Sequence, residues 1–161
     1  MALDSLGMDT KVSMTVLGIA LVLLYALGSG AFVDNSGWYQ SLNRPSWQPP
    51  DIVFGLIWPY NFIVLGISTY TVIRDRNVSS GAVFLTFLAL SVIAALAWSY
   101  YFYRPHDLAM ASVALALAAT FTVPLLIMTF QSKMILGLLM VPYQGWLITA
   151  TALSISYWRL N

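Results

Sequence analysis

Five long apolar segments alternate with short polar ones along the chain, and charged residues mark their boundaries. Charge-free intervals lie between Lys11 and Asp34, Asp51 and Arg74, Arg76 and Arg104, Asp107 and Lys133, and Lys133 and Arg159. Each interval has 22 to 27 residues, and a transmembrane helix needs roughly 20. The pattern predicts an all-α integral membrane protein, a five-transmembrane-helix bundle forming one domain over residues 1–161. The expected spans are 12–32, 52–73, 81–103, 108–130 and 134–158, after a polar tail over 1–11.

The first span has a competing interpretation as a cleaved signal peptide. Lys11 precedes the apolar run, and the small residues Ser29-Gly30-Ala31 stand near its end. A signal core has only about 7 to 15 apolar residues, and this run is longer. We therefore expect the segment to be retained as a helix.

The stretch between the first two spans, residues 34–51, is the longest polar interruption in the chain. Pro45 and Pro49-Pro50 push the residues before them toward extended geometry, which predicts a stiff, non-helical connector. Its aromatic residues could form an interfacial belt at the level of the lipid headgroups. The prolines beside the start of the next helix favour a different interpretation, in which the connector is a stiff lid over the bundle. The aromatic residues of this lid are Trp38, Tyr39 and Trp47.

The second span places aromatic and polar residues on neighbouring positions. Trp58 and Phe62 are four residues apart, which puts both rings on one helix face. Asn61 would be costly in lipid, so this face is expected to point into the bundle.

The third and fifth spans carry further candidate residues. Trp98 to Tyr103 forms an aromatic end typical of a membrane interface. Ser91 and Ala95 are a small-residue pair suited to helix packing, within the protein or between copies. In the fifth span Trp146 and Ala150 share a helix face. The residues after them match a pattern proposed for sterol binding. The same residues can also be interpreted as an interfacial tyrosine and an arginine whose side chain reaches the membrane surface. The residues of the sterol pattern are Leu153, Tyr157 and Arg159.

Composition and charge narrow the function. Hydrophobic residues make up 60% and charged residues 8% of the chain, whose net charge of +1 gives no case for nucleic-acid binding. Cysteine is absent, which excludes disulfides and thiolate metal sites. The expected spans contain no charged side chain, unlike most pumps and channels, and the six scattered aspartates suggest no acid/base pair. His106 is interpreted as a solvated loop residue. An aromatic, uncharged interior suits a flat apolar ligand.

The pattern Trp38-Tyr39-x-x-Leu42-x-Arg44-Pro45-x-Trp47-x-Pro49-Pro50 resembles the TspO/MBR family of tryptophan-rich sensory and translocator proteins, the peripheral benzodiazepine receptors. Trp58, Trp98-Ser99 and Val141-Pro142-Tyr143-x-x-Trp146 extend the resemblance over nearly the whole chain. The resemblance implies a five-helix bundle, commonly a homodimer, with a ligand pocket beneath the first connector. Members bind porphyrins, cholesterol and benzodiazepine-site ligands.

Together, the residue pattern and the resemblance give a set of expected ligand-binding residues. They are Trp38, Tyr39, Trp47, Pro49, Trp58, Asn61, Phe62, Trp98, Ser99, Tyr101, Trp146 and Ala150. Two departures from the family matter. Ala95 stands where many members have an asparagine, which removes a hydrogen-bonding side chain, and the fourth span is alanine-rich where members commonly carry a Trp or an acidic residue.

Three functions follow as hypotheses. The leading one is a membrane receptor or carrier for a tetrapyrrole such as porphyrin, or for a sterol-like molecule, with no required cofactor. The second is an enzyme that degrades porphyrin in light, since some bacterial members are reported to do so, with Trp58 and Trp146 implicated by the resemblance. The third is a regulatory partner of another membrane complex, held through Ser91 and Ala95. We expect the protein to lie in a prokaryotic inner membrane. The distribution of Lys and Arg between the two ends of the spans only weakly favours a cytoplasmic N-terminus.

Overall fold

The computed structural model describes the backbone of residues 2–33 and 37–161, with the side chains described from residue 7 onward. The first three residues of the expected connector, 34–36, lie outside the described part. The described chain is helical and contains no strand. Its helices are α1 (Ala2–Ala31), α2 (Gly37–Ser41), α3 (Asp51–Asp75), α4 (Val78–Tyr103), α5 (Leu108–Ser132) and α6 (Met134–Leu160).

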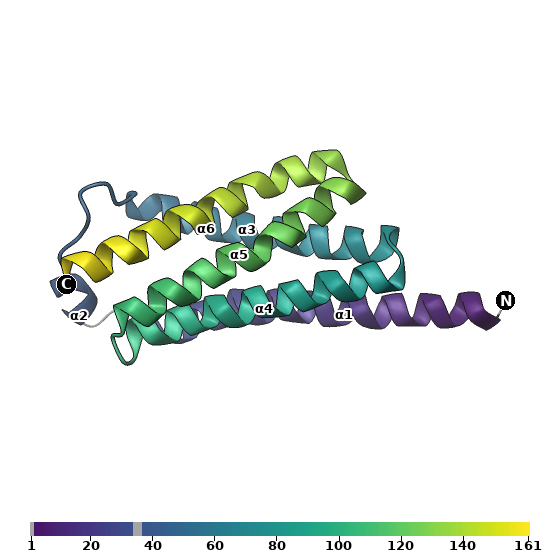
Figure 1. The fold of residues 1–161 in the computed structure, drawn as a ribbon, viewed down its shortest axis with the longest axis horizontal. Coiled ribbons are helices and arrows are strands. Elements are labelled where there is room, and N and C mark those ends of the chain that lie inside the picture. Colours follow the sequence, from purple (N-terminus) through teal and green to yellow (C-terminus); the bar gives the residue numbers. More distant parts are fainter. Residues whose placement is uncertain (1, 34–36) are drawn as a thin grey trace.

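Five of the described helices, all except α2, are long and apolar enough to cross a membrane. The prediction of an all-α protein with five spans is therefore confirmed. These helices run side by side as an elongated bundle (Figure 1). Two of the long helices begin with a side-chain cap. The Asn77 side chain accepts a hydrogen bond from the Ser80 backbone amide at the start of α4, and Asp107 accepts one from the Met110 backbone amide at the start of α5.

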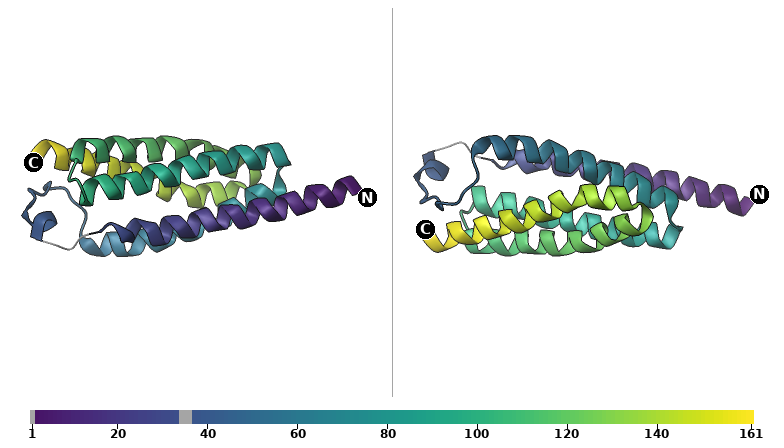
Figure 2. Two further views of the ribbon diagram at one scale, coloured as in Figure 1. Left: turned by 90° about the horizontal axis from the view of Figure 1, so that it is seen from below. Right: turned by 90° about the horizontal axis from the view of Figure 1, so that it is seen from above.

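The long helices form a closed ring in the order α1, α3, α6, α5, α4. Each helix packs against the next one in this order, and α4 returns to α1. Helix α3 also touches α4 and α5 across the ring. In both views of Figure 2 the short helix α2 and its connector lie at the end opposite the N-terminus, beside the end of α6.

Two predictions about local structure were wrong. Residues 2–11, expected to be a polar tail, are helical and extend α1 beyond its apolar part, because polar residues mark where lipid ends but do not stop a helix. The connector was expected to contain no helix, yet Gly37–Ser41 forms α2. Its first proline is Pro45, so residues 37–41 lie outside the proline-restricted stretch.

The small-residue pair of α4 lies inside the bundle. Ser91 is buried, and its Oγ donates a hydrogen bond to the Ala118 carbonyl of α5 at 3.4 Å. Ala95 is also buried in the core. The hypothesis that this pair holds an external partner is therefore wrong, because the residues pack within the chain.

Candidate functional site

A cavity of about 430 Å³ lies beneath the connector, at the end of the bundle that holds α2. This volume falls in the range of about 300 to 1,000 Å³ typical of small-molecule sites. Helices α1, α2, α3, α4 and α6 contribute to it, and α5 does not. Its lining consists of Ala26, Ser29, Gly30, Val33, Tyr39, Asp51, Phe54, Trp58, Phe62, Trp98, Phe102, Tyr103, Trp146, Ala150, Leu153, Ser154 and Tyr157.

One wall of the cavity is an aromatic ladder on α3. Phe54, Trp58 and Phe62 follow one another at intervals of four residues, so a regular helix places them on one face. The rings of Trp58 and Phe62 are stacked, with centroids 5.7 Å apart and an angle of 23° between their planes. Phe54 meets Trp146 of α6 edge to face at 5.1 Å. The ladder therefore links α3 to the opposite wall.

The wall from α4 repeats the same spacing. Trp98 and Phe102 are four residues apart, and their ring centroids lie 5.7 Å from each other. The indole Nε1 atoms of Trp98 and Trp146 are buried and have no hydrogen-bond partner among the described residues. An unsatisfied buried donor costs about 1 to 3 kcal/mol. The cavity wall thus carries two donors without a protein acceptor.

A polar cluster lies behind the α3 ladder. The Tyr25 ring meets the rings of Trp58 and Phe62 edge to face, at 6.1 and 5.1 Å. The hydroxyls of Tyr25 and Tyr143, and both amide atoms of Asn61, are buried without a partner among the described residues. Asn61 is completely buried, so its inward orientation is confirmed, but it does not line the cavity.

The connector is attached to α6 by hydrogen bonds. The Tyr157 hydroxyl donates to Oε1 of Gln48, and it lies 3.4 Å from the Tyr39 hydroxyl. Asn43 and Asn161 form a reciprocal pair of hydrogen bonds. The backbone N–H of Asn43 donates to Asn161 Oδ1 at 2.8 Å, and Asn161 Nδ2 donates to the backbone carbonyl of Asn43 at 3.2 Å. These contacts hold the connector over the mouth of the cavity.

A further contact joins the connector to the α4–α5 loop. The ring of Trp38 stacks on His106, with centroids 3.6 Å apart and an interplanar angle of 9°. His106 itself has a φ of 58°, a left-handed conformation uncommon for this residue type, and its side chain is exposed. The loop histidine is therefore a stacking partner as well as a solvated residue.

The structure brings half of the expected ligand-binding residues to the cavity. These are Tyr39, Trp58, Phe62, Trp98, Trp146 and Ala150. The other six do not line it: Trp38 stacks on His106, Trp47 is 48% exposed, and Pro49 lies in the connector. Asn61 sits behind the ladder, as described above. Ser99 donates to the Ser29 carbonyl at 3.1 Å, tying α4 to α1, and Tyr101 packs against Tyr100.

The residues of the sterol pattern divide between two environments. Leu153 and Tyr157 are buried and line the cavity, whereas Arg159 is exposed. The three side chains therefore do not form one patch facing the lipid. Tyr157 is thus a buried wall residue near the end of α6.

Several lining residues were missed in the sequence. Phe54 and Phe102 follow from the four-residue spacing to Trp58 and Trp98, a signal that was present. Ser29 of α1, Val33 just after α1 and Ser154 of α6 carry no such signal. Ala95, the departure from the family pattern, is buried in the core and does not line the cavity. Among the described residues, no group of three His, Cys, Asp or Glu residues is placed to hold a metal ion.

Comparison with known proteins places these features in a wider context. The model of the TspO/MBR family matches residues 16–159. Protein CrtK of Rhodobacter capsulatus is 31% identical over 151 residues, which cover 92% of this chain and 94% of that protein. The tryptophan-rich protein TspO of Bacillus cereus is 28% identical, with 86% and 90% covered. The human translocator protein is 28% identical, with 81% and 79% covered.

Proposed function

This chain belongs to the TspO/MBR family, and on that premise we propose that it is a membrane receptor or carrier for a tetrapyrrole such as porphyrin. A similar flat apolar molecule, such as a sterol, would bind in the same cavity. The observation that carries the proposal is the composition of the walls. Aromatic rings from α3, α4 and α6 line the cavity, and the rings of Trp58 and Phe62 are stacked along one of its walls.

The walls offer enough interaction energy for a flat ligand. An aromatic contact contributes about 0.5 to 1.5 kcal/mol beyond area burial, so four rings contribute about 2 to 6 kcal/mol. Micromolar affinity requires about 8 kcal/mol, and the burial of apolar ligand surface supplies the remainder.

The assembly and location of the protein form part of the proposal. We place it in a prokaryotic inner membrane as a homodimer, as the family resemblance implies. Four cations, Lys11, Arg74, Arg76 and Lys133, belong to the end of the bundle with the N-terminus, and three belong to the end with the cavity. This small excess favours a cytoplasmic N-terminus, so the cavity would open toward the opposite side of the membrane.

A second candidate function is the light-dependent oxidative breakdown of bound porphyrin by dioxygen. The observation that favours it is that Trp58 and Trp146 line the same cavity from facing helices. Both indoles would then lie against an excited ligand and could exchange electrons with it. The two functions differ in outcome, because a carrier leaves the porphyrin spectrum intact and an enzyme does not.

The test is a titration of the detergent-purified protein with protoporphyrin, in the dark and under illumination. Binding is followed by the porphyrin absorption band, since the variants lose a tryptophan fluorophore. Trp58→Ala and Trp146→Ala are expected to raise Kd by about two- to tenfold each. Trp158→Ala is the matched control, because this tryptophan is 52% exposed and does not line the cavity.

The outcomes separate the candidates. Unchanged affinity in both cavity variants contradicts the assignment of the site. Saturable binding with a stable spectrum under light supports a carrier. Bleaching to a discrete product that is lost in the double variant Trp58→Phe/Trp146→Phe supports the enzyme. Displacement of porphyrin by added cholesterol would extend the ligand class to sterols.

A further inference from the structure

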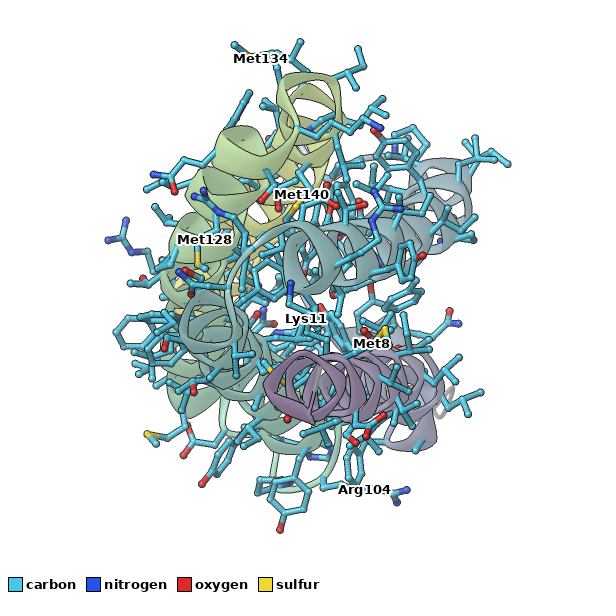
Figure 3. All side chains as sticks on the ribbon, turned by 90° about the vertical axis from the view of Figure 1, so that its right-hand side faces the viewer. Met8, Lys11, Arg104, Met128, Met134 and Met140 are labelled. Atoms are coloured by element: carbon cyan, nitrogen blue, oxygen red, sulfur yellow. The ribbon has the colours of Figure 1, made fainter. Side chains whose placement is uncertain are left out.

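A second hollow lies at the opposite end of the bundle from the ligand cavity. It has a volume of about 770 Å³ and is the more open of the two. It lies between the N-terminal half of α1 and the α3–α4 turn. Figure 3 looks onto this end of the bundle, with Met8 and Lys11 labelled beside α1. We call it the N-terminal groove.

One side of the N-terminal groove is an apolar strip on α1. Met8, Val12 and Val16 follow one another at intervals of four residues, so they form a row along one helix face. Their side chains are 65%, 58% and 65% exposed. Tyr70 of α3 and Val78 of α4 form the facing side. Eight residues of helix rise by about 12 Å, so the strip can accompany the headgroup and the first part of an extended acyl chain.

The polar end of the groove is cationic. Lys11 Nζ donates a hydrogen bond to the Arg74 carbonyl at 2.9 Å, which fixes the ammonium group across the gap between α1 and α3. An ammonium group has three N–H donors, so two remain. Among the described residues, the salt bridge at this groove joins Arg74 Nε to Asp75 at 2.7 Å. The Arg74 guanidinium also lies over the Tyr70 ring, with Cζ 5.3 Å from the ring centroid. Because Asp75 pairs with Arg74, Lys11 supplies the excess positive charge.

We propose that the N-terminal groove binds an anionic glycerophospholipid. The phosphate group would accept charge-assisted hydrogen bonds from Lys11 and Arg74. One acyl chain would lie along Val12 and Val16, on the bilayer side of Lys11, with Met8 at the level of the headgroup. Charge complementarity selects the headgroup, because basic pockets between transmembrane helices attract anionic lipids. The position selects a lipid as the occupant: Lys11 stands where the apolar run of α1 begins, which is the depth of the phosphate groups. The site is separate from the ligand cavity and does not depend on its function.

The test compares two lipids with identical acyl chains, phosphatidylglycerol and phosphatidylcholine, on the full chain in detergent. Native mass spectrometry measures the fraction of protein that retains each lipid. We expect the wild type to retain phosphatidylglycerol in preference, and Lys11→Gln to lower that preference about fivefold. Arg104→Gln is the matched control, since it removes one cation at the other end of the bundle.

A second pair of variants tests the apolar strip without changing charge. Val12→Trp fills the groove and is expected to reduce retention of phosphatidylglycerol. Leu17→Trp adds the same bulk to α1 at an exposed position outside the groove and is expected to leave retention unchanged. Circular dichroism checks that the variants remain folded.

Four results would overturn the proposal. The first is equal retention of the two lipids by the wild type. The second is a loss in Arg104→Gln as large as that in Lys11→Gln, which would indicate a general charge effect. The third is undiminished binding in Val12→Trp. The fourth is displacement of the lipid by an equal concentration of glycerol phosphate, which would show an anion site without a place for the acyl chain.

Discussion

Tyr157 offers a direct test of whether the connector acts as a latch over the cavity. The Tyr157→Phe substitution removes the hydroxyl that donates to Gln48 and lies 3.4 Å from the Tyr39 hydroxyl. The first contact is a good hydrogen bond, and the second is long. A net contribution of about 0.5 to 1.5 kcal/mol per hydrogen bond gives a loss of about 1 to 2 kcal/mol of latch stability. If the ligand leaves by opening of the connector, its release rate should rise about 5- to 30-fold.

The assay is stopped-flow release of protoporphyrin into an excess of lipid vesicles. Tyr157 also lines the cavity, so a second variant must separate the latch from ligand contact. Asn161→Ala provides it, because Asn161 is exposed, does not line the cavity, and makes two hydrogen bonds to Asn43 of the connector. It should also accelerate release. Tyr101→Phe is the control that should leave release unchanged.

Two results would refute this reasoning. Unchanged release in both Tyr157→Phe and Asn161→Ala would mean that the ligand does not leave past the connector. Faster release in Tyr157→Phe alone would assign the effect to contact between Tyr157 and the ligand. In either case the hydrogen bonds between the connector and α6 would serve the fold and not the gating of the cavity.

Three further predictions concern stability, measured by thermal unfolding in detergent. Asn61→Leu should stabilise the protein by about 1 to 3 kcal/mol, because both amide atoms lack a partner among the described residues; a lower Tm would reveal a satisfied network. Gln144→Leu should destabilise it by about 1 to 3 kcal/mol, because two buried hydrogen bonds to α5, of 2.7 and 2.9 Å, are lost. Gly137→Ala should cost about 1 to 3 kcal/mol, because its Cβ would lie 2.3 to 2.8 Å from atoms of Phe130. Gly66→Ala, which meets nothing within 4 Å, should not.

The membrane-spanning architecture could be predicted from the sequence because it depends on a single strong constraint. A charged side chain inside lipid is so costly that the charge-free intervals alone mark the five spans. The same constraint does not act on residues outside the membrane. It therefore could not predict that α1 begins at Ala2 or that Gly37–Ser41 is helical. Helix ends outside the membrane depend on local propensity and packing, which hydropathy does not record.

From helix spacing alone, the cavity walls were predictable where aromatic residues recur every four positions; Tyr39, Trp146 and Ala150 came from the family resemblance. Trp58 and Phe62 differ by four residues and share a face, as predicted, and Phe54 extends the row. Asn61 shows the limit of the rule. It lies about 60° around the helix from Trp58 and about 100° from Phe62, so helical geometry places it inward but cannot distinguish a cavity wall from the packed core behind it.

The contribution of α1 had no sequence signal of this kind. Its lining residues Ala26, Ser29 and Gly30 are small, and such residues serve equally well in ordinary helix packing. The connector has the same difficulty. Trp38 and Trp47 match the family pattern, yet the position of each ring depends on long-range contacts, such as the stack on His106.

Side chains form hydrogen bonds to backbone carbonyls of neighbouring helices close to two helix-interior prolines. Such bonds matter in a bilayer, where the polar groups of the backbone must be satisfied within the protein. The Tyr60 hydroxyl donates to the Leu139 carbonyl at 2.7 Å, in the turn before Pro142. Gln144 donates to the Ala119 carbonyl at 2.9 Å, in the turn before Pro124.

A bundle that satisfies its backbone across helices leaves two large aromatic donors unpaired in the cavity wall. The indole groups of Trp98 and Trp146 have no acceptor among the described residues, and Asn61 and Tyr25 are unpaired against the α3 ladder. The described Ser68, Arg76 and Ser132 also carry unpaired atoms, but they lie away from the cavity. Phenylalanine could replace either tryptophan without leaving a donor unpaired, and the ring stacking would be largely kept. The Nε1 atoms of both tryptophans are inaccessible to a water molecule, so a bound molecule meets the indole faces and not the N–H groups. We therefore expect Trp146→Phe, which keeps an aromatic face, to lose much less affinity for protoporphyrin than Trp146→Ala does, and equal losses in the two variants would refute the stacking argument.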